Sequence, residues 1–242
     1  PRHNIFNLDL LFFKLRNLNI YLISIDSLLE HCNILDLIWI PSFNFNINKY
    51  PNCSCKIISG WDSYLINKRF NDPIWSPGSK ILILTGGSDI LGLSESFPIQ
   101  LDDLLEKNTE VNWVRGPFSD PPNLPKTTRL NWIIHDAPEY LDELIIQSNY
   151  VITLFGVSFF EVLQYGIPSV VFSPDRKKDK EELDILIDHK IAEVANDSID
   201  AILSLIKLTK NNTLAKNLSK NALKIMSVNG TIKLSIEIKS LV

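Results

Sequence analysis

The sequence predicts an α/β protein built on a doubly wound, Rossmann-type parallel sheet. Short apolar segments rich in β-branched residues alternate with amphipathic segments from residue 80 onward, as strands and helices do in such folds. Two glycine-containing turns follow predicted strands directly, and ligands bind beyond the carboxyl ends of the strands in this architecture. We therefore expect a C-terminal domain over residues 79–242, preceded at 1–78 by part of a second α/β domain and a connector.

The first 78 residues have the pattern of the tail of an α/β domain. Leu8, Leu11, Phe12 and Leu15 recur at helical spacing with no strand before them, so we expect the chain to begin inside a domain. Strands are expected at 20–25, 37–40 and 56–59, with a short helix between the first two, an irregular asparagine-rich segment at 42–55 and a linker at 61–78.

The second domain opens with a strand at 81–84, which leads into the glycine turn Thr85-Gly86-Gly87-Ser88-Asp89. Further strands are expected at 111–114 and 131–134, and helices at 99–107 and at 138–147, where Pro138 would occupy the first turn. Beyond residue 174 the pattern predicts a charged helix at 177–188, a short strand or turn at 191–195, and helices at 198–209 and 213–226.

The stretch at 150–174 between these two parts has the pattern of one strand–helix–strand unit. Gly156 permits a tight turn after the first strand, and Ser158 followed by Glu161 has the spacing of a helix start. Gly166 and Pro168 then end the helix, because glycine tolerates positive φ and proline cannot continue a helix. The free N–H groups and the dipole at such a helix start favour an anion.

Composition excludes several classes of protein. The formal net charge is -4 with no basic block, which argues against nucleic acid as a partner. No apolar run reaches the roughly 18 residues that span a bilayer, so we expect a cytoplasmic protein without a transmembrane segment. The 3 cysteines indicate a reducing compartment and ordinary thiols, since Cys53-Ser54-Cys55 lacks the second pair that a zinc site needs. We expect no metal and no cofactor.

Either glycine turn alone is equally well explained as a tight turn that needs small residues. Two such turns at the ends of separate strands, with Ser158 and Glu161 correctly spaced, favour a ligand site. Ser158 as a nucleophile is disfavoured because Gly-Val-Ser-Phe-Phe lacks the second glycine of a nucleophile elbow. His135 and Asp136 follow a predicted strand, where site residues gather, although a polar strand end is the simpler interpretation. His3, His31 and His189 have no partners recognisable from the sequence.

These segments resemble nucleotide-sugar enzymes of the GT-B architecture, with the closest patterns in the UDP-sugar hydrolases of pseudaminic acid biosynthesis and the lipid II N-acetylglucosaminyltransferases. The likeness rests on ILILTGGSDI, on residues 133–152 and on GVSFFEVLQYGIPSVVFSP, and covers roughly residues 80–195. Ser158 stands where threonine is usual in the family, and Glu181 and Glu182 stand where relatives often carry glutamine facing the sugar. The alternative interpretation of those two glutamates is that they lie on a solvated helix face.

The resemblance implies a role for each matching residue. Gly86, Gly87 and Ser88 would form the family's glycine turn, and the backbone of Ile134 would pair with uracil. Backbone N–H groups at Gly156, Val157 and Ser158 would hold the diphosphate, and Glu161 would accept hydrogen bonds from the ribose.

The implied activity is that of a UDP-sugar hydrolase or a glycosyltransferase of surface polysaccharide or nonulosonic acid biosynthesis. The family's glycine-rich loop and its histidine base lie at the start of the N-terminal domain, and His3 has no such context. The catalytic residues are therefore unknown, and three alternatives stay open: a truncated enzyme, a partner chain that supplies the missing half, or a subunit that binds without catalysing.

Overall fold

A computed structural model describes residues 8–241 of the chain. It divides into two compact units, one formed by Lys68–Ser227 and the other by the residues up to Asn67 together with those from Val228 onward. This division differs from the expected boundary between residues 78 and 79 and from the expected extent of the second domain to residue 242. The connector after residue 67 packs on the larger unit, and the C-terminal helix packs on the smaller one.

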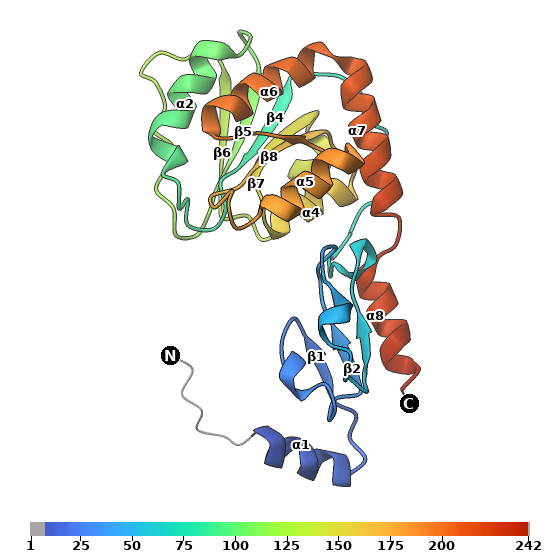
Figure 1. The fold of residues 1–242 in the computed structure, drawn as a ribbon. Helices are drawn as coiled ribbons and strands as arrows, with labels where there is room; N and C mark the ends of the chain where they lie inside the picture. The colour runs from blue at the N-terminus through green and yellow to red at the C-terminus, as the bar shows by residue number, and fades with distance from the viewer. Residues whose placement is uncertain (1–7, 242) are drawn as a thin grey trace. The chain divides into compact units, whose positions relative to one another are not determined.

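The larger unit contains a parallel sheet of 6 strands in the order β6-β5-β4-β7-β8-β9 (Figure 1). The strands are β4 (Lys80–Leu84), β5 (Glu110–Arg115), β6 (Asn131–Asp136), β7 (Tyr150–Leu154), β8 (Ser169–Phe172) and β9 (Glu193–Val194). Chain order runs outward from β4 to one edge and from β7 to the other, so the topological switch point lies between β4 and β7. The predicted doubly wound parallel sheet is confirmed.

Helices bury both faces of this sheet. Ile81 and Ile83 of β4 pack with α2 (Leu93–Leu104) and α6 (Ser198–Lys210), and the alternate residues Leu82 and Leu84 pack with α3 (Asp142–Gln147) and α4 (Val157–Gln164). Alternation of side chains between two apolar faces is the reason that the central strands β4, β7 and β8 are almost wholly apolar. The helices α5 (Lys180–His189) and α7 (Asn212–Ile225) complete the unit.

Three helix boundaries differ from expectation. α2 begins at Leu93 rather than near residue 99, because both carboxylate oxygens of Asp89 accept hydrogen bonds from the N–H groups of Leu93 and Ser94. Pro98 is tolerated inside α2 since the Ser94 carbonyl that it leaves unpaired accepts from the N–H of Asn123 at 2.7 Å. α3 begins at Asp142 and not at Pro138, and α5 begins at Lys180 and not at residue 177.

The smaller unit is a parallel sheet of 3 short strands in the order β1-β2-β3, with helices on both faces. Its elements are α1 (Leu8–Asn17), β1 (Ile23–Ile25), η1 (Leu29–His31), β2 (Leu37–Trp39), η2 (Ile47–Lys49), β3 (Lys56–Ile58), η3 (Trp61–Ser63) and α8 (Gly230–Lys239). Ile38 packs with Phe12 of α1, whereas Leu37 and Trp39 pack with Leu234 of α8. α8 was not expected from the sequence, and the expected short helix between the first two strands is only the 3-residue turn η1.

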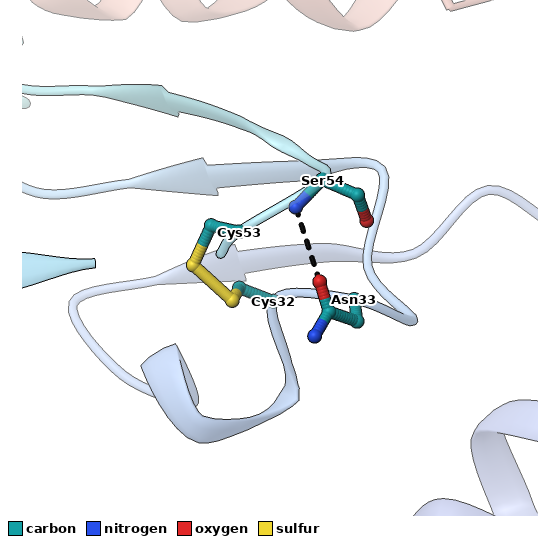
Figure 2. The surroundings of a disulfide bond; sticks show 4 residues. All are labelled: Cys32, Asn33, Cys53 and Ser54. Atoms are coloured by element: carbon teal, nitrogen blue, oxygen red, sulfur yellow. Dashed lines mark hydrogen bonds between the residues drawn. A yellow bond between two sulfur atoms is a disulfide. The ribbon is translucent and has the colours of Figure 1, made fainter. Parts of the chain in front are cut away.

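A disulfide joins Cys32, directly after η1, to Cys53, which precedes β3 (Figure 2). The expectation of ordinary thiols is wrong for this pair, because the chain brings together cysteines that lie 21 residues apart in the sequence. The disulfide also removes the argument from cysteine content for a reducing compartment. Beside the disulfide, the N–H of Ser54 donates to Oδ1 of Asn33 at 3.1 Å. Cys55 is a free thiol, and burial raises its pKa.

The connector is fastened to the larger unit by Arg69 and Trp75. Arg69 lies 3.1 Å from the carboxylate of Asp142, and the indole N–H of Trp75 donates to the carbonyl of Asn149 at 2.7 Å. These contacts explain why the larger unit begins at Lys68 and includes most of the predicted linker. None of the helices within residues 8–241 is long and apolar enough to cross a membrane.

Candidate functional site

The two glycine turns meet at the switch point of the larger sheet. A cavity of about 280 Å³ lies between the residues that follow β4 and those that follow β7. Its lining includes six residues that the sequence predicted as ligand-binding: Gly86, Gly87, Ser88, Gly156, Val157 and Ser158. Two turns that lie about seventy residues apart in the sequence therefore form one concave surface at the place where open α/β sheets bind ligands.

A second cavity of about 330 Å³ adjoins the first and shares Thr85, Gly86, Gly87 and Ser158 with it. The rest of its lining comes from the end of β4 and from the ends of β5 and β6 with the residues that follow them, and it is mostly apolar: Leu84, Val114, Arg115, Gly116, Pro117, Ala137, Pro138 and Leu141. An apolar compartment next to one built of turns and a helix start suits a ligand with a flat ring at one end and a charged group at the other.

The glycines in these turns fall into two classes. Gly86 has φ +83°, and a Cβ on Gly116 would lie 2.3 Å from the carbonyl oxygen of Gly86, so both glycines are required by the protein itself. Gly87 and Gly156 are different, since a Cβ on either would meet no atom within 4 Å. Gly156 has φ 167°, an extended backbone that any residue adopts, which corrects the expectation that it is needed for a tight turn. Both open positions line the first cavity.

The start of α4 faces this cavity without a side-chain cap. The cap position is Gly156, which has no side chain to bond the first N–H groups, and α4 begins at Val157. Ser158 is thus the second residue inside the helix and not its cap, which corrects the sequence expectation. Uncapped N–H groups and the positive end of the helix dipole are the features that bind phosphate at helix starts.

Glu161 lies one turn into α4 and is a partly buried carboxylate. Within residues 8–241 it has no hydrogen-bond or ion-pair partner, in contrast to Asp142, which binds Arg69 and Tyr165. Burial, and secondarily the charge of Asp142, raises the pKa of Glu161 above its ordinary value. An unpaired carboxylate in such a place costs folding free energy, and its raised pKa is typical of functional sites.

Thr85 is a further candidate site residue, which the sequence placed in the glycine turn but to which it assigned no role. It lines both cavities and is 1% exposed, and its hydroxyl oxygen has no hydrogen-bond partner within residues 8–241. Buried hydroxyls without a partner are rare in folded proteins. The structural role of Asp89 was also missed, because its hydrogen bonds to the first two N–H groups of α2 depend on the path of the chain after the turn.

Other residues singled out from the sequence do not line either cavity. Ile134 lies in the edge strand β6, Glu181 and Glu182 lie in the first turn of α5, and Glu161 lies three residues after Ser158 in α4. His135 belongs to β6 itself, where its Nε2 lies 2.8 Å from Oδ1 of Asn112 and burial lowers its pKa. His31 contacts Asp9 at 2.9 Å, and His3 lies outside the described residues. Residues 8–241 contain no group of side chains that could hold a metal ion.

Comparison with solved structures gives the class of fold. No protein-family model matches the chain, and no curated protein matches it in sequence. The solved structures that it matches include several glycosyltransferases, and the chain has their GT-B fold, as the sequence predicted.

Three of these structures illustrate the likeness. MurG of Acinetobacter baumannii matches with a TM-score of 0.62 and 17% identity over 95% of this chain and 69% of that one. The glycosyltransferase SnogD from Streptomyces nogalater gives 0.58 and 11% over 97% and 76%. UGT2 of Phytolacca americana, solved with UDP-2-fluoro-glucose and pterostilbene, gives 0.56 and 11% over 88% of this chain and 55% of that one. At these identities the likeness is one of fold.

Proposed function

We propose that residues 68–227 form the donor-binding domain of an enzyme that uses a nucleoside diphosphate sugar, with UDP-sugar as the donor. The observation that supports this most strongly is the pair of positions Gly87 and Gly156, where the cavity wall lacks a Cβ although neither the backbone nor the packing requires glycine. Space held open beside an uncapped helix start suits a bound diphosphate. The donor-bound glycosyltransferase structure among the neighbours agrees with this class of ligand.

Each part of the donor has a place in the proposal. The N–H groups at Gly156, Val157 and Ser158 bind the diphosphate, with Gly86, Gly87 and Ser88 on the opposite side of the cavity. The apolar second cavity accepts the uracil ring near the end of β6, where Ile134 offers its backbone. Glu161 accepts hydrogen bonds from the ribose hydroxyls, and the sugar extends toward Glu181 and Glu182 in α5.

The proposed chemistry is cleavage of the bond between the sugar and the diphosphate. Donors that point at the leaving diphosphate stabilise the negative charge that develops on it, and they do so equally for attack by water or by an acceptor hydroxyl. The chain spans 69% of MurG and 55% of UGT2, so the activity of the whole enzyme is part of the proposal. A cytoplasmic transferase or hydrolase of surface polysaccharide or nonulosonic acid biosynthesis is the role that we favour.

The alternative is a non-catalytic subunit that needs a partner chain, and neighbours that are glycosyltransferases do not favour it. Incubation with UDP-sugars, with and without acceptors, separates the possibilities. UDP release without an acceptor identifies a hydrolase, release only with an acceptor identifies a transferase, and no release under either condition contradicts both.

Calorimetry on the chain tests the donor site directly. UDP should bind more tightly than uridine, because only the diphosphate meets the N–H groups and the dipole of α4. Glu161→Ala should weaken UDP binding by roughly tenfold or more, as expected for lost hydrogen bonds to a charged acceptor. Circular dichroism shows whether the variant is folded. Equal affinities for UDP and uridine, or an unchanged affinity in the folded variant, would overturn the proposal.

A further inference from the structure

One face of α4 leads from the candidate site to the connector. Ser158 lines both cavities, Glu161 lies three positions later, and Tyr165, which ends the helix with helical φ and ψ, lies four positions after that. Residues three and four apart share one face of a helix, so these side chains follow one another along α4. The hydroxyl of Tyr165 donates to Oδ2 of Asp142 at 3.0 Å. The carboxylate of Asp142, at the start of α3, therefore stands beside the face of α4 that carries Glu161.

The connector binds the same carboxylate of Asp142. Nε and Nη2 of Arg69 lie 3.2 Å and 3.1 Å from Oδ1, and the backbone N–H of Arg69 donates to Oδ2 at 3.3 Å. The guanidinium also lies 3.8 Å from the ring centroid of Tyr140, and Phe70 packs on the apolar cluster that α3 and α4 share. Asp142 is buried, so without Arg69 it would be a buried charge without a cation.

Asp142 and Glu161 are thus two carboxylates on packed helices with opposite circumstances. Burial of Asp142 favours its neutral form, but hydrogen bonds from Arg69 and Tyr165 outweigh this effect and lower its pKa. Burial raises the pKa of Glu161, and the charge of Asp142 raises it further. Because like charges disfavour each other's ionised forms, the cation beside Asp142 relieves a repulsion that would otherwise act on Glu161.

The other charged groups around α4 are exposed or bound elsewhere. Nζ of Lys68 donates to the carbonyl of Gln164 at 3.3 Å and pairs with Asp72. Glu143 of α3 is exposed, and the strands β7 and β8 that pack on α4 have no charged residue. The lysines of α7, the other helix that packs on α4, are exposed as well: Lys216, Lys220 and Lys224. Asp142 is the charge that raises the pKa of Glu161.

We propose that Arg69 is a positioning residue of the donor site, which keeps Glu161 ionised by offsetting the charge of the neighbouring Asp142. The inference rests on the proposed function, in which ionised Glu161 accepts hydrogen bonds from the ribose, and it adds a residue of the connector to those that set the affinity for the donor. Arg69 lines neither cavity, so it acts through Asp142 and Glu161 and not by touching the donor.

Carbon-13 NMR of the glutamate carboxyl groups measures the titration midpoint of Glu161 without UDP, and loss of a signal in Glu161→Gln assigns it. We expect Arg69→Gln to raise this midpoint, because the charge of Asp142 is left without its cation. Asp142→Asn should lower it, because the like charge is removed. The double variant Arg69→Gln/Asp142→Asn should return toward the wild-type midpoint, since a cation and an anion are removed together.

Two further variants separate charge from structure. Arg69→Lys keeps the positive charge and should restore the midpoint to near its wild-type value. Lys207→Met is the matched control, because it removes a cation whose ion pair, 2.9 Å from Glu193, involves neither α3 nor α4. It should leave the midpoint of Glu161 unchanged. Circular dichroism verifies each fold, and where one single variant of the pair does not fold, the direction of the shift in the other decides.

Calorimetry with UDP across the same pH range measures the consequence for binding. At the wild-type midpoint half of Glu161 is ionised, so Arg69→Gln should weaken UDP binding about twofold or more, and Asp142→Asn should strengthen it by up to about twofold. A purely structural role would weaken binding in both variants. That result would overturn the inference, as would NMR midpoints that stay in place or move in the same direction. If the midpoints shift as expected and the UDP affinity does not follow them, the effect on Glu161 is supported and the proposed donor role of Glu161 fails.

Discussion

Gly87 and Gly156 are positions where one added methyl group should weaken ligand binding without affecting the fold. A Cβ at Gly156 meets open space and its backbone is extended, so Gly156→Ala should leave the melting temperature of the chain unchanged. The same methyl group enters the proposed phosphate position, so UDP affinity should fall about tenfold or more. Thermal unfolding and calorimetry measure the two quantities.

The matched control for Gly156→Ala is Gly116→Ala. A Cβ on Gly116 would lie 2.3 Å from one carbonyl oxygen and 2.5 Å from another, so this variant should lose stability as well as affinity. A Gly156→Ala variant with a lower melting temperature than the wild type, or with an unchanged affinity for UDP, would show that the glycine serves the turn and not the ligand.

The raised pKa of Glu161 should make the stability of the folded chain depend on pH. Its pKa is raised in the folded protein, so between its ordinary pKa of about 4.5 and the raised value the folded state holds more protons than the unfolded state. Stability from this group is therefore present below pH 4.5 and is lost as the pH rises through the raised pKa. Glu161→Gln should then unfold at a higher temperature than the wild type at pH 7, and the difference should shrink toward pH 4.

The same substitution removes the charged acceptor, so Glu161→Gln should also weaken UDP binding at pH 7. The exposed residue Glu139 offers a control, and Glu139→Gln should change neither the stability nor the affinity. A Glu161→Gln variant that is less stable than the wild type at pH 7 would mean that the carboxylate has a structural partner.

At the scale of elements, Gly166 fixes how α4 ends and packs on α7. Its φ is +65°, as the sequence predicted, and a Cβ there would lie 2.5 Å from Cγ of Leu223. Gly166→Ala should therefore cost about 1 kcal/mol or more in the free energy of unfolding by urea. In a Leu223→Ala background the cost of Gly166→Ala should be smaller but not zero, because the clash is removed and the backbone strain stays. A cost of zero in that background would assign the whole effect to packing.

The central strands β4, β7 and β8 of the larger sheet are predictable because both of their faces are buried, so that continuous apolar runs such as Tyr150–Leu154 stand out. The glycine turns are predictable for the same reason, since they punctuate those runs. The starts of helices are harder to predict from the sequence. The start of α2 depends on Asp89 folding back onto Leu93 and Ser94, and its passage through Pro98 depends on Asn123, a contact across 29 residues of sequence.

The candidate site likewise has some features that the sequence predicts and others that depend on tertiary packing. Residues that line the first cavity belong to local turns with a recognisable composition, and these could be named in advance. The orphan hydroxyl of Thr85, the approach of Gly116 to Gly86 and the unpaired state of Glu161 are products of tertiary packing. No local pattern encodes them, and of the three, the states of Thr85 and Glu161 are the ones that favour a ligand site over a pair of tight turns.

At the scale of the whole molecule, the disulfide and the proposed donor site belong to different units. Cys32 and Cys53 lie in the smaller unit, and their separation of 21 residues predicts a stabilisation of about 3 kcal/mol from loop closure. A sheet of three-residue strands has little other burial to replace this contribution. Cys32→Ala/Cys53→Ala should therefore lower the urea midpoint of the smaller unit, followed by far-UV circular dichroism, with Cys55→Ser as the control.

The affinity for UDP should be unchanged in that variant, because every residue proposed to bind the donor lies within Lys68–Ser227. The chain joins the two units at residues 67–68 and 227–228, and the contacts of the connector residues Arg69 and Trp75 are made inside the larger unit. Parallel loss of UDP affinity and of the first unfolding transition would contradict this and would show that the two units fold as one cooperative body.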